Sequence, residues 1–214
     1  MFEHFNDNLF VYYSSGYASN CYLLIGKKIA LIDSGLASEQ NDIELFLKSA
    51  GLTFEDVDIV LHTHAHADHF GNSHVFKKAS KQMFEFDAKY VNLKDEIFTC
   101  SSLLDSNSFP KIDSFFQDGQ VIDLKPFSLK VILTSGHTKG SVCFFEEKQK
   151  WLFSGDTLFA DNCGRFDLPS GNKSELIGSL KKLKELNFEV LFPGHGLVSK
   201  KFDKNIIQSL ISSL

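Results

Sequence analysis

Four side chains that can bind a metal ion fall within six consecutive residues of this sequence. They are His64, His66, Asp68 and His69, in the pattern H-x-H-x-D-H. Neutral imidazole and carboxylate are ligands that zinc, iron and manganese share, so the pattern predicts a metal site without identifying the metal. A single histidine in a loop is more often a surface or hydrogen-bonded residue. Three histidines at this spacing, together with an aspartate, favour metal binding over that alternative.

The backbone around this cluster favours two metal ions over one. Residues 57–61 are predicted to form a strand, so the cluster begins where the strand ends and a loop opens. In extended backbone His64 and His66 point the same way, because side chains alternate with a period of two. Asp68 and His69 follow where the chain turns toward a helix, and they can face a different direction. Such a division of ligands suits a pair of cations.

The elements of the first half of the chain also place an aspartate, Asp33, at the end of a strand. Aromatic and aliphatic runs predict the strands, and apolar residues at helical spacing predict a helix that Gly51 ends. An aspartate just before a glycine turn is either a turn residue or a hydrogen-bonding support for metal ligands. The predicted strands are 9–14, 20–25, 28–33 and 83–86, and the predicted helices are 38–50, 69–80 and 88–105.

The second half of the chain repeats this order of strands and helices. A strand precedes the loop that contains His137, a hairpin ends at Asp156, and a short strand ends in the loop that contains His195. Ser174 is predicted to be the N-cap of the helix between the last two. The predicted strands are 115–124, 127–133, 141–146, 150–153 and 190–192, and the predicted helices are 174–186 and 203–214.

Each of these isolated polar residues lies just after a predicted strand and has a glycine within a few positions. If the strands align in sheets, their loops can meet the histidine cluster at one edge. Glycine beside a ligand permits the sharp turns and close approaches that an ion site needs. Any one of them alone would more often be a capping or solvent-facing residue. The residues concerned are Asp33, His137, Asp156 and His195.

The composition favours one compact domain over residues 1–214. Apolar residues make up 43% of the chain, 22 residues are phenylalanine, and no linker rich in proline, glycine or serine divides it. This apolar content argues against disorder and predicts an aromatic core. The formal net charge is -5 and no dense basic run is present. A surface for nucleic-acid phosphates is therefore not expected.

The cysteines and the N-terminus indicate where the protein would work. The four cysteines are scattered without a C-x-x-C pair, so neither a disulfide framework nor a thiolate zinc site is predicted. The N-terminal residues lack an apolar core of signal-peptide length, and no run approaches the roughly 18 apolar residues of a membrane span. We expect a soluble cytoplasmic protein with no membrane partner. The oligomeric state stays open.

Five motifs in a fixed order resemble those of the metallo-β-lactamase superfamily. After LIDSG (31–35) come THAHADH (63–69), GHTKGS (136–141), SGDTLF (154–159) and PGHG (193–196), and together they span most of the chain. The resemblance implies an α/β fold, the four-layer αβ/βα sandwich, in which the two halves pack sheet to sheet. It places the metal site along one edge of the sheets.

The resemblance also implies a ligand set for two divalent metal ions, with zinc favoured and iron or manganese as alternatives. Carried over residue by residue, every ligand position of the family is filled in this sequence. The ligands of the first ion are His64, His66 and His137, those of the second are Asp68, His69 and His195, and the bridging ligand is Asp156.

Other residues take their expected roles from the same resemblance. Asp33 and Asp68 are assigned to the catalytic machinery, Asp33 through hydrogen bonding that supports the metal ligands and Asp68 as a ligand. His4, His62 and His74 match no ligand position, so we expect them to be ordinary histidines.

The stretch TLFADNCGRFDLPSG (157–171) is similar to a loop of the hydroxyacylglutathione hydrolases (glyoxalase II) and of the persulfide dioxygenases. It contains Arg165, the only arginine among 22 basic residues. An always-charged bidentate donor suits a substrate carboxylate or thiol-conjugate backbone, whereas a structural pairing with Asp167 is the alternative. The long form of glyoxalase II ends in a helical domain that helps to hold glutathione, but this chain ends about twenty residues after His195. The thiol carrier is therefore left open.

On this basis we expect a dinuclear metal-dependent hydrolase, a thioesterase of the glyoxalase II type. Hydroxide shared by two metal ions would attack the thioester carbonyl, and the ions would stabilise the resulting oxyanion. A mononuclear iron persulfide dioxygenase, a lactonase and a non-catalytic metal-binding protein are the alternatives. The expected partner is a small-molecule thioester or ester, and a nuclease is disfavoured by the acidic balance.

Overall fold

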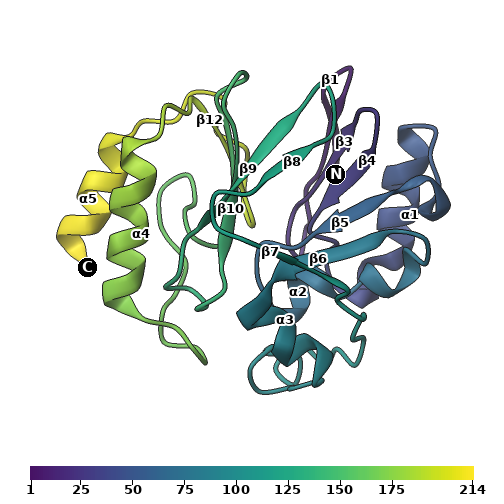
Figure 1. Ribbon diagram of the computed structural model, residues 1–214, viewed down its shortest axis with the longest axis horizontal. Coiled ribbons are helices and arrows are strands. Elements are labelled where there is room, and N and C mark those ends of the chain that lie inside the picture. Colours follow the sequence, from purple (N-terminus) through teal and green to yellow (C-terminus); the bar gives the residue numbers. More distant parts are fainter.

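Two β-sheets packed face to face form the centre of the molecule, and helices cover their outer faces (Figure 1). The computed structural model describes residues 1–214. The first sheet has seven strands in the order β1-β2-β3-β4-β5-β6-β7, and the second has five in the order β12-β11-β10-β9-β8. This arrangement confirms the predicted α/β fold with four layers.

The seven strands of the first sheet lie side by side in sequence order. Strands β1 to β4 pair antiparallel, and strands β4 to β7 pair parallel. Each parallel step needs a crossover, and these crossovers contain α1 (Gln40–Ser49), α2 (Ala67–Phe70) and α3 (Glu85–Asn92). The strands are β1 (Phe2–Asn6), β2 (Leu9–Tyr12), β3 (Cys21–Ile25), β4 (Ile29–Ile32), β5 (Ile59–Leu61), β6 (Ser80–Phe84) and β7 (Ser114–Phe116).

The second sheet is antiparallel from β8 to β11 and gains one parallel strand, β12. The crossover to β12 contains α4 (Lys173–Glu185), and α5 (Asn205–Ser213) packs beside it. None of the helices combines the length and the apolar character that a membrane-spanning segment requires. The strands are β8 (Val121–Asp123), β9 (Ser128–Leu133), β10 (Val142–Glu146), β11 (Trp151–Gly155) and β12 (Val190–Pro193).

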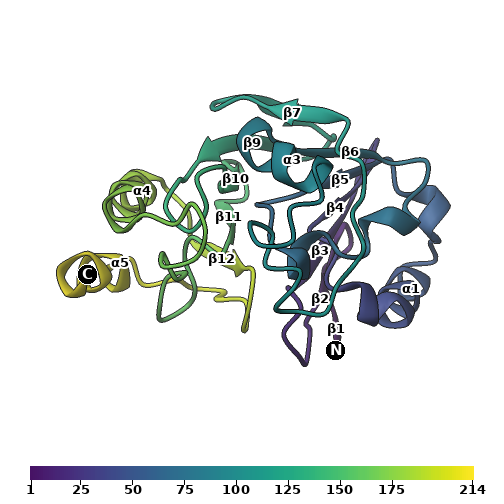
Figure 2. The same cartoon turned by 90° about the horizontal axis from the view of Figure 1, so that it is seen from below.

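Three apolar layers hold the four structural layers together. The largest, a cluster of 19 buried residues, lies between the sheets and includes the stacked rings of Phe153 and Phe192. A second cluster lies between the first sheet and α1, and a third lies between the second sheet and helices α4 and α5. Figure 2 shows α1 and the α4–α5 pair on opposite sides of the sheets. Burial on both faces keeps the strands in register, so their ends form a fixed frame for the loops.

Some predicted elements differ from the observed ones. Residues 69–80, predicted as a helix, contain only the end of α2, a 3₁₀ turn at Ser73–Val75 and the start of β6. Residues 115–124, predicted as one strand, are split between β7 and β8 in different sheets by a turn at Gly119, whose φ is 80°. The predicted N-cap Ser174 was wrong, because the Asn172 side chain accepts the Glu175 N–H. Strand β1 was not predicted.

Candidate metal centre

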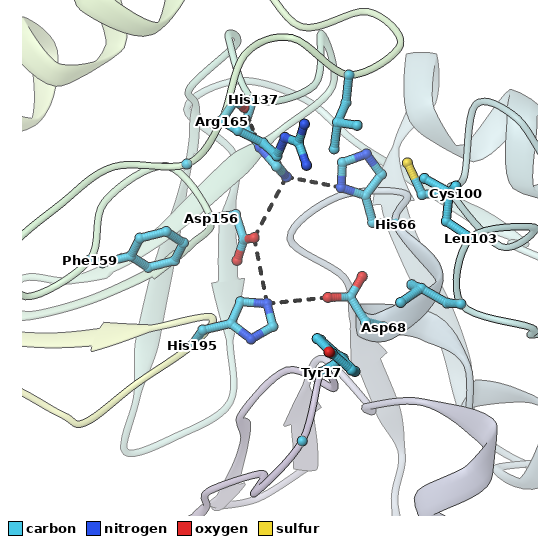
Figure 3. Close-up of a pocket in the computed structure, with 14 residues that line it drawn as sticks. Tyr17, His66, Asp68, Cys100, Leu103, His137, Asp156, Phe159, Arg165 and His195 are labelled. Atoms are coloured by element: carbon cyan, nitrogen blue, oxygen red, sulfur yellow. Dashed lines mark hydrogen bonds and ion pairs between the residues drawn. The ribbon is translucent and has the colours of Figure 1, made fainter.

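The seven predicted ligands come together at one edge of the two sheets, although they are far apart in the sequence. Four lie on the loop and short helix that follow β5, and the others follow β9, β11 and β12. Figure 3 shows five of them facing one another across the site. They form three overlapping groups, within each of which the ligand atoms lie within 4.8 Å of one another. The groups are His64, His66 and His137; His64, His69 and Asp156; and Asp68, His69 and His195.

The first group is a cluster of three buried imidazoles. Nδ1 of His66 lies 3.1 Å from Nε2 of His64 and 2.9 Å from Nε2 of His137. Each of the three residues is almost completely inaccessible to solvent. Three nitrogens therefore point at one small volume, which is how three protein ligands surround a catalytic zinc ion.

Asp156 lies between this group and the second one. Its Oδ1 is 3.2 Å from Nε2 of His69, and its Oδ2 is 3.7 Å from Nε2 of His137 and 3.6 Å from Nε2 of His195. On the second side, Oδ2 of Asp68 is 3.2 Å from Nε2 of His195 and 3.6 Å from Nε2 of His69. One carboxylate thus faces ligand atoms of both groups, as a bridging ligand would.

Hydrogen bonds on the outer side of the imidazoles leave lone pairs directed into the site. Nδ1 of His137 donates to the Arg165 carbonyl at 2.7 Å, and Nδ1 of His69 donates to the Asp33 carboxylate at 2.8 Å. In the neutral form that metal ligation requires, an imidazole has one donor and one acceptor nitrogen, so Nε2 of both would then be an acceptor. Nε2 of His69 and Oδ1 of Asp156 have no hydrogen-bond partner although both are buried. With His69 neutral, two acceptors would face each other in a buried site, an arrangement that fits a cation between them.

Burial and the neighbouring carboxylates shift the pKa values of the histidines in opposite directions in the two groups. Burial, with help from the neighbouring imidazoles, lowers the pKa of His64 well below its ordinary value and that of His66 to about 3. Burial also opposes the charge of His69, but the nearby carboxylates, Asp156 foremost, outweigh it and raise the pKa of His69. The first group is therefore neutral at pH 7, as metal ligation by imidazole requires. The second group carries carboxylates that attract a cation.

Asp33 lies behind the ligands rather than among them. Its Oδ1 accepts the N–H of Thr63 at 2.9 Å, and its Oδ2 accepts the Thr63 hydroxyl and Nδ1 of His69, each at 2.8 Å. Its backbone is left-handed, with φ of 55°, a conformation that aspartate adopts more readily than most residues. The structure thus places Asp33 where it orients His69. Thr63 is the first residue of the motif THAHADH (63–69), but no role was assigned to it from the sequence.

Two glycines let the second half of the chain approach the ligands closely. Gly155 has φ of 48°, and a Cβ there would overlap the Thr63 side chain. A Cβ at Gly194 would overlap Oδ1 of Asp156. The predicted use of glycine beside the ligands is confirmed at these two positions.

A cavity of about 480 Å³ opens over the ligands. Figure 3 shows Tyr17, Leu103 and Phe159 on different sides of the ligand atoms, and Leu104 and Leu168 also line the cavity. None of these residues was assigned a role from the sequence, although Phe159 and Leu168 lie in the stretch 157–171 that resembles a loop of the hydroxyacylglutathione hydrolases. They lie in irregular loops, where no periodic pattern indicates which way a side chain points.

Arg165 lies at the rim of this cavity and is paired with Asp167. Nε and Nη2 donate to the two carboxylate oxygens of Asp167, each at 2.8 Å, and hydrogen bonding by the arginine holds the pKa of Asp167 at about 2. The structure therefore shows the structural pairing that the sequence left as an alternative. The Arg165 backbone has a separate role, since its carbonyl is the acceptor for His137.

The three remaining histidines, His4, His62 and His74, belong to none of the ligand groups. His62 is fully buried behind the cluster, where Nδ1 donates to the Gln82 carbonyl and Nε2 contacts the Ser73 hydroxyl. Its hydrogen bonds are satisfied within the fold, so it is an ordinary core histidine, as predicted.

Comparisons with known proteins agree with this geometry. A family model described as metallo-beta-lactamase superfamily matches residues 15–195. The chain is 34% identical over 193 residues to a probable metallo-hydrolase of Methanocaldococcus jannaschii, a match that covers 87% of this chain and 91% of that protein. It is 31% identical over 199 residues to the hydroxyacylglutathione hydrolase GloC of Haemophilus influenzae, covering 85% and 87% of the two chains.

A solved structure shows the same fold. A metallo-beta-lactamase family protein of Thermus thermophilus superposes with a TM-score of 0.81 at 24% identity, over 96% of this chain and 78% of that chain. The family match spans the motifs that supply all seven candidate ligands. The chain therefore belongs to the metallo-beta-lactamase superfamily.

Proposed function

We propose that this protein is a dinuclear metal-dependent thioesterase of the glyoxalase II type. Members of its superfamily bind divalent metal ions and are generally hydrolases. The observation that carries the proposal is the position of Asp156, whose two oxygens face two separate groups of ligands. A mononuclear site would leave one of these groups without an ion.

The two groups divide the work of metal binding. The three imidazoles of the first group would hold one ion, and Asp68, His69 and His195 would hold the other, with Asp156 shared between them. Two divalent ions bound there would supply a hydroxide nucleophile at neutral pH and stabilise the oxyanion that develops on the substrate. Imidazole and carboxylate donors suit zinc, which we favour, and also iron or manganese.

The protein residues orient the ligands and handle protons. Asp33 keeps the proton of His69 on Nδ1, so that Nε2 stays available as a ligand. Asp68 borders the cavity, and its carboxylate can take the proton that the attacking water loses. A departing thiol has an ordinary pKa of about 8.5, so cleavage of a thioester needs no strong acid in the site.

The cavity suits a small thioester with an apolar portion. A volume of about 480 Å³ lies within the usual range for small-molecule sites, and the walls are largely apolar. The relative named hydroxyacylglutathione hydrolase supports a hydroxyacyl thioester as the substrate. We include Arg165 as a substrate contact, because its pair with Asp167 is exposed and contributes little stability, so a substrate carboxylate can replace Asp167.

Metal analysis combined with an assay on S-lactoylglutathione and other acyl thioesters tests the proposal. We expect two metal ions per chain and thioester cleavage in the purified protein. Replacing Asp156 by alanine is expected to remove most of the metal and to lower kcat by more than roughly 100-fold. Losing a residue that only hydrogen-bonds to a metal ligand can cost up to about 100-fold, and losing a ligand should cost more. Full activity of D156A would overturn the proposal.

The same measurements separate the alternatives. One iron per chain together with oxygen consumption would indicate a persulfide dioxygenase and contradict the hydrolase proposal. Cleavage of lactones in preference to thioesters would indicate a lactonase. Two bound metals without turnover of any ester, thioester or lactone would indicate a metal-binding protein.

A further inference from the structure

A second buried aspartate, Asp87, connects the two halves of the candidate metal centre. It lies in the first turn of α3 and is fully inaccessible to solvent. Its Oδ2 accepts the N–H of Ala65 at 2.9 Å and the hydroxyl of Thr138 at 2.7 Å, and its Oδ1 accepts the N–H of Gly140 at 2.8 Å. The donors therefore come from two loops that lie far apart in the sequence.

These two loops carry the ligands of the three-histidine group. Ala65 lies between His64 and His66, so a hydrogen bond to its N–H fixes the extended segment that points both imidazoles the same way. Thr138 directly follows His137. By holding both loops, one carboxylate sets the distance between the imidazoles on either side of the group.

The carboxylate fits this place closely. A Cβ at position 140 would overlap Oδ1 of Asp87, so the approach of the carboxylate to the third-histidine loop depends on Gly140. The hydroxyl of Thr138 is also held by Ser141 at 2.7 Å, which orients it toward Asp87. The loop is thus shaped around the carboxylate.

An ordinary role in helix α3 does not explain this burial. An acidic residue in the first turn of a helix can favour the helix dipole while it remains in solvent. Asp87 instead forms none of the molecule's ion pairs and is surrounded by neutral donors, an arrangement that costs free energy because a buried charge loses its hydration. Burial accordingly raises the pKa of Asp87 to about 6, although its three hydrogen bonds oppose the shift.

We propose that Asp87 is a positioning residue for the three-histidine ligand group and acts through the backbone of both ligand loops. It differs from Asp33, which contacts the ligand His69 directly. The proposal rests on the metal-binding part of the proposed function and does not depend on which substrate is cleaved.

Zinc affinity of the D87N protein tests this inference. Asparagine keeps the shape of the side chain, but it replaces one acceptor oxygen by an NH₂ group that faces a backbone N–H or the Thr138 hydroxyl. The variant is made both alone and together with H195A, which weakens the second ligand group and leaves the three-histidine group to be titrated with zinc against a chelator. In both backgrounds we expect D87N to lower the affinity of the three-histidine group by about 10- to 100-fold.

Glu146 supplies a matched control. It is a buried carboxylate at the far end of β10 from the ligand loops, and it accepts the backbone N–H of Gln149. E146Q removes a buried charge in the same way, so we expect it to alter the unfolding temperature but to change zinc affinity by less than about twofold. A general effect on folding would move both variants alike.

A second variant keeps the test usable if D87N folds poorly. G140A keeps the Asp87 side chain but inserts a Cβ that would overlap Oδ1, so the carboxylate has to shift. In folded G140A we expect weaker zinc binding at the three-histidine group. Wild-type zinc affinity in folded D87N or G140A would overturn the inference, as would an equal loss in E146Q. Because no substrate is present in the titration, a failure of the thioesterase proposal leaves this result unaffected.

Discussion

The two ligand groups of the candidate metal centre differ in how firmly the fold holds them. His64, His66 and His137 are buried, whereas the His195 side chain is 32% exposed and that of Asp68 is 14% exposed. The two loops that carry the first group are both hydrogen-bonded to Asp87, through the N–H groups of Ala65 and Gly140. In the second group His69 is buried as well, and residues of both groups line the cavity: His66 and His137 from the first, Asp68 and His195 from the second. The first group is therefore the more buried of the two, and the second contains the most exposed candidate ligand, His195.

The hydrogen bonds of the imidazoles set His195 apart from His69 and His137. Nδ1 of His69 is fixed by Asp33, and Nδ1 of His137 is fixed by the Arg165 carbonyl. Nε2 of His195 is paired with Asp68 and Asp156, which are themselves candidate ligands, and the ring packs beside those of His69 and Phe159. Its orientation would therefore depend on the bound ion. This comparison predicts that losing a ligand from the buried group is the more damaging change.

The largest expected effect comes from comparing H66A with H195A. H66A removes a ligand from the buried group, and we expect it to lose one metal ion and more than about 100-fold in kcat/KM. H195A is expected to keep the ion of the buried group and to lose less activity, because the open position can be completed by water. Metal content per chain and kcat/KM measured on both variants check the order. Greater loss in H195A would contradict the comparison.

The sequence was most informative where a ligand followed directly from a strand. Asp156 comes at the end of β11 and His195 two residues after β12, so a correct strand prediction also placed the side chain at the sheet edge. The histidine cluster was identifiable from its spacing alone. Local rules were sufficient there because both the strand and the loop are specified within about ten residues.

The rest of the site depends on contacts between distant segments. Nothing in the sequence around Asp87 distinguishes it from an acidic residue in the first turn of an exposed helix, and only the fold brings Thr138 to it. Similarly, residues 115–124 have one continuous pattern of strand-forming residues, but Gly119 divides them between two sheets. Burial and sheet membership were decided by tertiary packing, which local propensity does not encode.

The second-largest expected effect concerns Asp33, which lies behind the second ligand group and holds His69. D33N keeps the size of the side chain but removes the charge that holds His69 and Thr63. We expect zinc affinity of the second group to fall by about 10- to 100-fold, with a smaller change at the three-histidine group, because Asp33 reaches that group only through Thr63. A two-step zinc titration measures both affinities, and D58N is a suitable control because Asp58 bonds the Ile29 N–H at the other end of the sheet. Equal losses in both steps would show that the two groups are not held independently.

The smallest expected effect concerns His62, which lies behind the ligand cluster, and it is measured in metal-free protein. Burial lowers the pKa of His62 to about 4, and only part of this shift is offset by Asp33. Between about pH 6.5 and pH 4 the unfolded chain therefore binds a proton at His62 that the folded chain does not, so stability falls as the pH falls. At pH 5 this amounts to about 2 kcal/mol for one such group. In metal-free protein, the difference in unfolding free energy between pH 7 and pH 5 is expected to be smaller in H62Q by that amount, as measured by urea denaturation. The other buried histidines are present in both proteins, so their contributions cancel in the comparison. Identical pH dependence of the two proteins would mean that folding does not lower the pKa of His62.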